Sequence, residues 1–218
     1  MKADIIIPAF NEAERIETTL NSLKNEKWVE KIIVVDDGSE DNTKIIAKRH
    51  CDELVIHDRN RGKSAAIYTG LSYVESDFIL LLDSDLGETV TEGRKLLSPV
   101  ISKKADMTVA IFPHFSKRGF GFVKRRGQRV IYRETGYRIT SPLSGQRCFH
   151  RSWIPYILSK TGYGFGLEMS LNLLFLKNGG VIKEVATSMN HRLTGKDFSG
   201  MYHRFKQWRE MEKTIWNY

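Results

Sequence analysis

The first 90 residues alternate between short, continuous apolar runs and segments with helical spacing. Apolar residues recur three or four positions apart between the runs, as in Ile16, Leu20 and Leu23. The four runs, each ending in polar residues, are 3–10, 31–37, 52–57 and 77–85. Strands that are apolar throughout are buried on both faces, and their alternation with helices is typical of a parallel sheet. The sequence therefore predicts an α/β fold with a mostly parallel sheet flanked by helices.

The second half is less regular. Residues 106–113 predict another strand, and 164–179 predict a helix that ends at a glycine pair. A loop containing proline and glycine, 140–151, leads to a strand or turn, and 180–193 predict a strand entering a polar turn. With 218 residues, 41% of them hydrophobic, and no linker-like tract, the chain is expected to form a single domain, 1–218.

Polar residues follow each strand predicted in the first half. Because the carboxyl ends of parallel strands share one edge of the sheet, where ligands bind, these residues should converge. They are Pro8 to Glu12, Asp36 to Ser39, Asn60 to Lys63, and Asp83 to Asp85. The sequence thus predicts a ligand site at this edge.

The run "FILLLDSDLGE" places Asp83 and Asp85 directly after a buried strand. Two carboxylates about 6 Å apart can share a divalent cation, and hard oxygen ligands favour Mg²⁺ or Mn²⁺. An Asp-x-Asp alone is equally typical of a strand surfacing into a polar turn. Lys63, in "RNRGKSAA", is a candidate to neutralise diphosphate charge. A P-loop is excluded, because His57 stands where that motif requires glycine.

The net charge of +8 comes from 34 Lys and Arg against 26 Asp and Glu, and the excess is concentrated between residues 114 and 138. Eight basic residues there face one acidic residue, Glu134, and aromatic residues are interleaved with them. Such a segment is either a solvated loop or a surface for nucleic acid, an anionic membrane or a phosphorylated substrate.

The C-terminal stretch 198–218 shows helical spacing of apolar residues surrounded by basic ones. It predicts a helix packed on the domain, a helix packed on a second subunit in a homodimer, or an interfacial helix on a membrane. No apolar run approaches the roughly 18 residues that cross a bilayer, and no charged leader precedes the first strand. A cytoplasmic protein, with peripheral attachment to the inner membrane face as a variant, is expected. Cys51 and Cys148 are expected to be reduced thiols.

Four motifs, "DIIIPAFNEAERI", "VVDDGSEDNT", "NRGKSAAIYTG" and "LLDSD", resemble in order and spacing those of family 2 type glycosyltransferases with the GT-A fold. Further along, "SPLSGQR", "GFGLE" and "NHR" are similar to elements of glucosyl-3-phosphoglycerate synthases, and the Glu-bearing helix also resembles polyprenyl-phosphate glycosyltransferases. The resemblance implies a nucleotide-sugar-binding half, 1–90, and an acceptor-side half, 91–218. It also implies transfer from a nucleotide sugar, most simply a UDP-sugar, to a hydroxyl or phosphate of a phosphorylated small molecule or a membrane lipid.

The resemblance also implies roles for individual residues. Nucleotide-sugar contacts fall on Pro8, Ala9, Phe10, Glu12, Asp36, Asp37, Lys63, Asp83 and Ser84. Asp85 and His191 would hold Mg²⁺ or Mn²⁺, and Asp85 and Glu168 would be catalytic. Acceptor contacts fall on Ser144, Gly145 and Arg147.

Several alternatives stay open at this level. Glu168 begins an apolar helix, where a carboxylate also simply stabilises the helix end, and a lone histidine such as His191 is also typical of a surface. A nucleotidyltransferase would combine a parallel sheet with carboxylates and a metal, but no glycine-rich motif follows the first strand. A basic nucleic-acid-binding protein is the rival from another class, although no nucleic-acid partner is expected. Retention or inversion at the sugar is left open.

Overall fold

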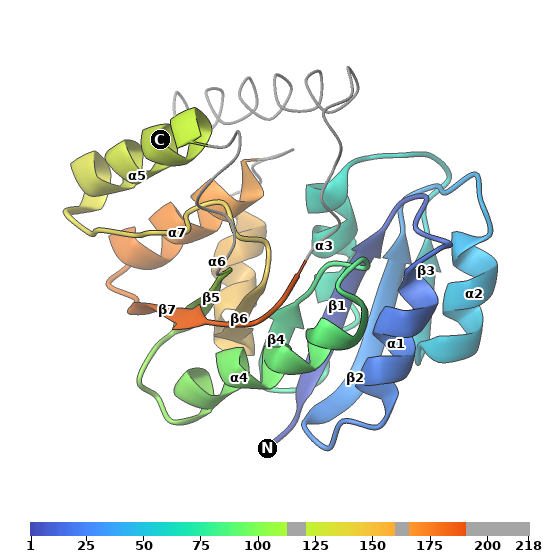
Figure 1. Ribbon diagram of the computed structural model, residues 1–218. Coiled ribbons are helices and arrows are strands. Elements are labelled where there is room, and N and C mark those ends of the chain that lie inside the picture. The colour runs from blue at the N-terminus through green and yellow to red at the C-terminus, as the bar shows by residue number, and fades with distance from the viewer. Residues whose placement is uncertain (113–120, 160–165, 191–218) are drawn as a thin grey trace.

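One seven-stranded sheet runs through the molecule, with helices on both faces (Figure 1). The structure is a computed structural model and describes residues 1–112, 121–159 and 166–190. The strands are β1 (Ala3–Ala9), β2 (Val29–Asp36), β3 (Glu53–Ile56), β4 (Phe78–Leu81), β5 (Met107–Ile111), β6 (Arg147–His150) and β7 (Ile182–Ala186). The α-helices are α1 (Ile16–Lys24), α2 (Thr43–His50), α3 (Lys63–Leu71), α4 (Gly93–Ile101), α5 (Gly121–Thr135), α6 (Ile154–Ser159) and α7 (Leu167–Lys177). Two 3₁₀ helices are η1 (Gly87–Glu92) and η2 (Arg151–Trp153).

The strand order is β3-β2-β1-β4-β6-β5-β7. All described pairings are parallel except those of β6, which is antiparallel to both of its neighbours, β4 and β5. The predicted α/β class with a mostly parallel sheet flanked by helices is confirmed. The sequence left 147–150 as a strand or a turn; the structure makes it a strand of opposite direction inside the sheet.

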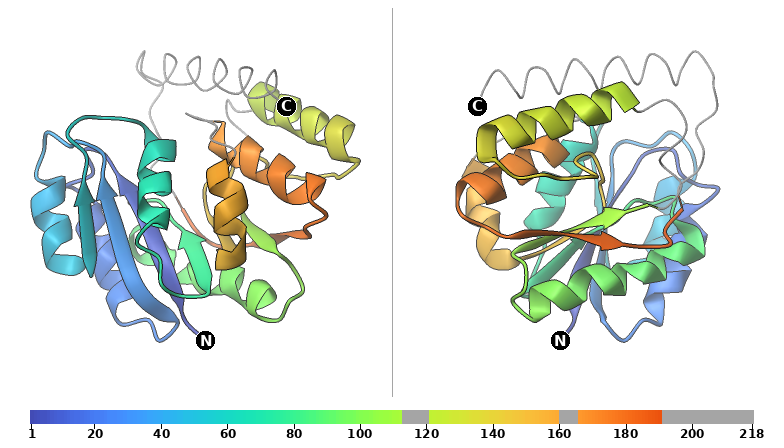
Figure 2. Two further views of the ribbon diagram at one scale, coloured as in Figure 1. Left: turned by 180° about the vertical axis from the view of Figure 1, so that it is seen from behind. Right: turned by 60° about the vertical axis from the view of Figure 1, so that its left-hand side comes forward.

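Alternate residues of the central strands bury their side chains on opposite faces of the sheet. Ile6 and Ile33 point into the core beneath α3, α5, α6 and α7, while Ile5, Ile7 and Val34 point into the core beneath α1, α2 and α4. Figure 2 shows these two helical layers from two further sides. The unbroken apolar runs of the sequence are the direct result of burial on both faces.

Two helices depart from the expectations. The basic segment was open between a solvated loop and a binding surface, and residues 121–135 form a helix, whose Val130 and Ile131 are buried. No element was predicted for residues 93–101, which form α4; Pro99 lies inside this helix, and burial of Leu96 and Leu97 outweighs the helix-breaking tendency of proline. The predicted C-terminal helix, 198–218, lies outside the described residues. Within the described ranges, no helix is long and apolar enough to cross a membrane.

Helix α3 packs so closely on the sheet that Gly70 has no room for a side chain. A Cβ there would lie 2.6 Å from Cγ2 of Ile6 and 3.4 Å from Cγ2 of Val35. We expect Gly70→Ala to lower the free energy of unfolding by about 1–3 kcal/mol in chemical denaturation, despite the better helix propensity of alanine. Gly121→Ala is the control, since its nearest neighbour is the Arg125 side chain at 3.7 Å. Equal stability of the two variants would contradict the packing argument.

Candidate functional site

The polar segments that follow the strands come together at one edge of the sheet, as predicted. Strands β1, β2 and β4 are parallel neighbours, with Ala9 opposite Asp36 in the ladder. The loops after them are joined by hydrogen bonds: the Asn11 amide donates to Ser39 Oγ at 3.0 Å, and the Arg61 amide to Asp37 Oδ1 at 2.9 Å. The parallel register therefore builds the site.

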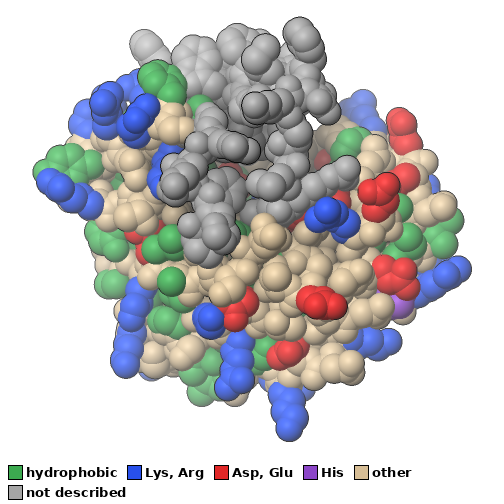
Figure 3. Space-filling view, viewed as in Figure 1, with side chains coloured by type: hydrophobic (Ala, Val, Ile, Leu, Met, Phe, Trp, Pro, Cys, Tyr) green, Lys and Arg blue, Asp and Glu red, His purple; other side chains and the backbone are tan. Residues whose placement is uncertain are grey.

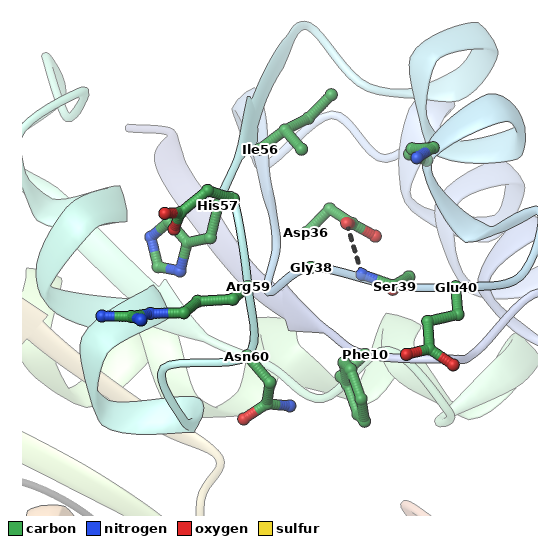
Figure 4. Close-up of a pocket in the computed structure, with 11 residues that line it drawn as sticks. Phe10, Asp36, Gly38, Ser39, Glu40, Ile56, His57, Arg59 and Asn60 are labelled. Atoms are coloured by element: carbon green, nitrogen blue, oxygen red, sulfur yellow. Dashed lines mark hydrogen bonds between the residues drawn. The ribbon is translucent and has the colours of Figure 1, made fainter.

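A pocket of about 340 Å³ lies between the loops after β1, β2 and β3 (Figure 4). Its lining residues are Phe10, Asp36, Gly38, Ser39, Glu40, Lys44, Ile56, His57, Asp58, Arg59 and Asn60. Asp36 is fully buried, and its Oδ1 accepts the Ser39 amide at 2.9 Å. Its Oδ2 is buried without a hydrogen-bond partner among the described residues. A buried acceptor of this kind is costly unless a ligand supplies a donor.

Asp37, the next residue, is occupied within the protein. Its Oδ1 lies 2.6 Å from His57 Nδ1, and its Oδ2 accepts the Gly62 amide at 2.7 Å, in addition to the Arg61 bond. His57 is also buried, with Nε2 3.0 Å from Thr69 Oγ1 of α3. Both Asp36 and Asp37 were predicted to contact the nucleotide sugar. The structure separates them, because Asp37 fastens the loop 57–62 and Asp36 faces the pocket.

The turn after Asp37 requires glycine. Gly38 has φ = +76°, and a Cβ on it would lie 2.5 Å from the carbonyl carbon of Arg59. The loop 57–62 therefore lies directly on this turn, and it ends at Gly62, the residue before α3.

Lys63, the first residue of α3, is the centre of a second cluster beyond this loop. Its Nζ lies 2.5 Å from Asp83 Oδ1 and 3.9 Å from Glu168 Oε1. Gln146 is fully buried, and its Nε2 donates to Asp83 Oδ2 at 2.6 Å. Gly145 borders the cluster, since a Cβ there would lie 2.6 Å from Lys63 Nζ. The structure thus brings together two predicted site residues from the first half, Lys63 and Asp83, and two from the second, Glu168 and Gly145.

Charge in this cluster is closely balanced. Burial lowers the pKa of Lys63, but the carboxylates of Asp83, Glu168 and Asp85 together raise it above its ordinary value. Burial raises the pKa of Glu168, an effect that Lys63 and Arg147 offset only in part. Glu168, 8% exposed in the first turn of α7, therefore holds a proton more readily than an ordinary glutamate. That property suits a proton acceptor or a hydroxyl-orienting group.

Thr19 of α1 holds the Asp-x-Asp turn in place through two hydrogen bonds. Thr19 Oγ1 donates to the carbonyl oxygen of the buried Ser84 at 2.8 Å and accepts the Gly87 amide at 2.8 Å. Asp85 is partly exposed and close enough to Lys63 to raise its pKa. Its carboxylate has the oxygen chemistry that Mg²⁺ or Mn²⁺ prefers, and it fits one ligand position of such an ion. No group of three or more His, Cys, Asp or Glu suited to a metal gathers within the described ranges, and His191 lies outside them.

The predicted acceptor residues fall into two kinds. Ser144 and Gly145 are partly exposed in the loop that enters β6. Arg147 is fully buried: its guanidinium donates to the carbonyl of Pro142 at 3.2 Å and to Asn172 Oδ1 at 2.7 Å, and its Nε donates to the carbonyl of Ser144 at 2.9 Å. Two of these bonds hold the loop before β6, and the third joins Arg147 to α7. The direct contact of Arg147 with an acceptor stays a prediction.

Of the four residues predicted at the end of β1 and just after it, Phe10 lines the pocket. Phe10 is 42% exposed and lines it, whereas Ala9 is buried and its carbonyl accepts the Asp37 amide at 2.8 Å. Pro8 is partly buried at the end of β1, and the amide of Glu12 donates to Thr43 Oγ1 at 2.8 Å. Contacts of these four residues with a nucleotide sugar stay a prediction.

Sequence reasoning missed three residues of the site: His57, Gln146 and Asn172. His57 was read only as the residue that breaks a P-loop motif. A polar residue within a predicted strand or apolar helix, such as Asn172 in α7, was the available signal, because buried polar side chains need partners.

Comparison with known proteins agrees with this geometry. Residues 4–158 match the family model described as Glycosyl transferase family 2. The chain belongs to this family. The predicted membership, the GT-A fold and the assignment to the glycosyltransferases are therefore confirmed, and the nucleotidyltransferase and nucleic-acid-binding alternatives lose their basis.

Three similar proteins show which glycosyltransferases the chain resembles. The chain is 28% identical to a UDP-N-acetylglucosamine–dolichyl-phosphate N-acetylglucosaminyltransferase of Methanococcus voltae, over 68% of this chain and 69% of the relative. It is 36% identical to an undecaprenyl-phosphate 4-deoxy-4-formamido-L-arabinose transferase of Yersinia enterocolitica, over 63% and 41%. Glucosyl-3-phosphoglycerate synthase of Mycobacterium tuberculosis, solved with Mg²⁺ and UDP, shares the fold with a TM-score of 0.79, 22% identity and coverage of 98% and 78%. The chain spans less than two thirds of the length of several curated relatives.

The raised pKa of Glu168 predicts a pH-dependent stability. Because the pKa is higher in the folded protein than the value of 4.5 for an ordinary glutamate, the stability contributed by Glu168 is full below that value and is lost as the pH rises through the folded pKa. Glu168→Gln should therefore gain melting temperature relative to the unchanged protein as the pH is raised from about 4 to 8. Scanning calorimetry at both pH values measures this. If the difference in melting temperature between the two proteins stayed constant or shrank as the pH rose, a raised pKa of Glu168 would be contradicted.

Proposed function

We propose that the chain transfers a sugar from a UDP-sugar to a phosphate-bearing acceptor in the presence of Mg²⁺ or Mn²⁺. The observation that carries the proposal is the placement of the Asp36 pocket and the Lys63 cluster at the two ends of one loop, 57–62. A nucleotide sugar needs a base site, a diphosphate site and a sugar site in that order. The loop joins the first two of these sites within a single short segment.

The base would lie in the Asp36 pocket. The N3–H of uracil is a donor, and Oδ2 of Asp36 is a buried acceptor without a partner among the described residues. Phe10, which is exposed on the pocket wall, offers a ring for stacking. Among the relatives, the enzyme of Methanococcus voltae is named for a UDP-sugar, and the solved synthase was crystallised with UDP.

The diphosphate would lie at the start of α3. Lys63 leads this helix, its side chain is about one third exposed, and its ammonium is held at the strand ends by Asp83. A lysine and a helix N-terminus both attract phosphate oxygens. Asp85, with His191 from outside the described residues, would hold the metal ion, which when bound would neutralise charge on the departing diphosphate.

The acceptor would approach from the loop that enters β6. Gly145 in this loop borders both Lys63 and Asp83, and Glu168 is within ion-pair distance of Lys63. The carboxylate of Glu168 would accept the acceptor proton or orient the attacking oxygen. Arg147 would act as a positioning residue for this loop. A phosphate-bearing acceptor is supported by the relatives, two of them named for lipid phosphates and one for a phosphoglycerate product.

Base selection is tested by Asp36→Asn. The amide oxygen can still accept the Ser39 amide, but the amide nitrogen now offers the pocket a donor in place of an acceptor. We expect the preference for UDP over CDP, measured by calorimetric titration, to fall by at least about tenfold, the loss typical of a charge-assisted hydrogen bond. Asp58→Asn, a change on the exposed rim of the same pocket, is the control. An unchanged preference in Asp36→Asn would remove the base from this pocket.

Turnover is tested by a screen of nucleotide sugars with Mg²⁺ or Mn²⁺, offered with a soluble phosphorylated hydroxy acid or a short polyprenyl phosphate. Product formation should need both the metal and the phosphorylated acceptor. Asp85→Asn should reduce it by more than about 100-fold, as loss of a group acting on the transition state does, and chelation of the metal should do the same. Glu88→Gln, an exposed carboxylate three residues away, should leave it unchanged. Full turnover of Asp85→Asn would refute the metal assignment.

A further inference from the structure

Helix α5 lies directly on the acceptor side of the candidate site. Its buried stripe consists of Gly127, Val130 and Ile131. A Cβ on Gly127 would lie 3.1 Å from Sδ of Met169 in α7 and 3.4 Å from Cγ of Pro142, in the loop that enters β6. The helix is therefore fixed in place by the same elements that carry Glu168 and Ser144.

The opposite face of α5 is exposed, basic and aromatic. Positions 122, 125, 129, 132 and 133 fall on one side of a helix, and all five residues are exposed: Phe122, Arg125, Arg129, Tyr132 and Arg133. Phe122 is 66% exposed and Tyr132 50% exposed. We call these five residues the α5 face. Exposed apolar side chains that gather with basic ones on one face are a feature of interaction surfaces.

Positive charge exceeds negative charge in and next to the α5 face. Arg138, beyond the helix, adds its guanidinium 5.2 Å from the centre of the Tyr132 ring. The only acidic residue of the segment 121–138 is Glu134, which is partly buried and paired with Arg133 at 2.9 Å and Lys177 at 3.3 Å. Figure 3 shows the resulting group of Lys and Arg side chains, with apolar ones between them, over α5.

The α5 face is also at the functional end of the molecule. Both Figure 1 and Figure 2 place α5 at the end toward which β1 and β2 run, which is the end that carries the Asp36 pocket and the Lys63 cluster. A flat partner held by α5 would therefore lie beside the loop that enters β6, at the end of the sheet that carries the candidate site.

We propose that the α5 face docks on the anionic surface of a lipid bilayer. Arginines on one side of a helix bind lipid phosphates, and exposed Phe and Tyr rings enter the headgroup region. Arginines and exposed aromatic rings on one face are together typical of a helix that lies on a membrane surface. The inference rests on the proposed function in one respect, since it selects a lipid phosphate over a soluble phosphate as the acceptor. Single-stranded RNA is a weaker match, because Tyr132 already carries Arg138 over its ring.

Vesicle flotation of the full chain, without donor or acceptor, tests the docking. The probe is phosphatidylcholine vesicles with about one third phosphatidylglycerol, compared with pure phosphatidylcholine, at low and high salt. We expect binding to the anionic vesicles alone, lost at high salt. Replacement of Arg125, Arg129 and Arg133 by alanine together should lower the partition coefficient on the order of 100-fold, as loss of three surface charges predicts. Phe122→Ser should also weaken binding at low salt, because the apolar contact of its ring with the headgroup region is removed.

The matched control removes three exposed positive charges elsewhere, by changing Lys24, Lys48 and Arg49 of α1 and α2 to alanine. It should bind within about twofold of the unchanged protein. Absence of binding to anionic vesicles, an equal loss in both triple variants, or retention on RNA in place of vesicles would overturn the proposal. Circular dichroism excludes unfolding as the cause. Because no sugar transfer is measured, a failure here leaves the proposed transfer reaction standing, and a failure of UDP binding leaves the docking standing.

Discussion

The carboxylate of Asp37 is the point on which the arrangement of the site depends. It accepts the amides of Arg61 and Gly62 and lies 2.6 Å from a ring nitrogen of His57, so that three points of one loop are held by one buried side chain. Charge-assisted bonds to a buried carboxylate are among the stronger hydrogen bonds of a protein. This loop separates the Asp36 pocket from Lys63 and fixes the distance between them. If this loop were flexible, the distance between the Asp36 pocket and Lys63 would not be defined.

The second half of the site depends on a buried positive charge. Arg147 is fully enclosed, and burial lowers its pKa to about 10, so the guanidinium still carries its charge at neutral pH. Asn172 and two backbone carbonyls satisfy it, and its field partly offsets the raised pKa of Glu168. Removal of one partner from such a network costs more stability than the intact network provides, because a buried charge is left without a partner. The shape of the acceptor loop and the proton affinity of Glu168 are thus linked through one side chain.

The first half of the fold was predictable, because its evidence is local. Each of β1, β2 and β4 is an apolar run followed by polar residues, and parallel pairing brings those ends together without further information. The second half was not, because its evidence is long-range. The antiparallel direction of β6 follows from its place between β4 and β5, and the burial of Arg147 follows from contact with α7, 25 residues away in the sequence. A charged residue in a predicted loop is expected to be exposed. Only the tertiary structure shows that Arg147 is buried instead.

The reversed direction of β6 has a consequence for how such enzymes diversify. Because β6 runs against β4, the loop that enters one strand meets the turn that leaves the other, and Gln146 joins Asp83 across that junction. Residues 141–145 belong to no ladder of the sheet and do not line the Asp36 pocket. Under the proposed function, acceptor preference can therefore drift between lineages through the partly exposed side chains of this loop, such as Ser144, while the donor chemistry is inherited unaltered.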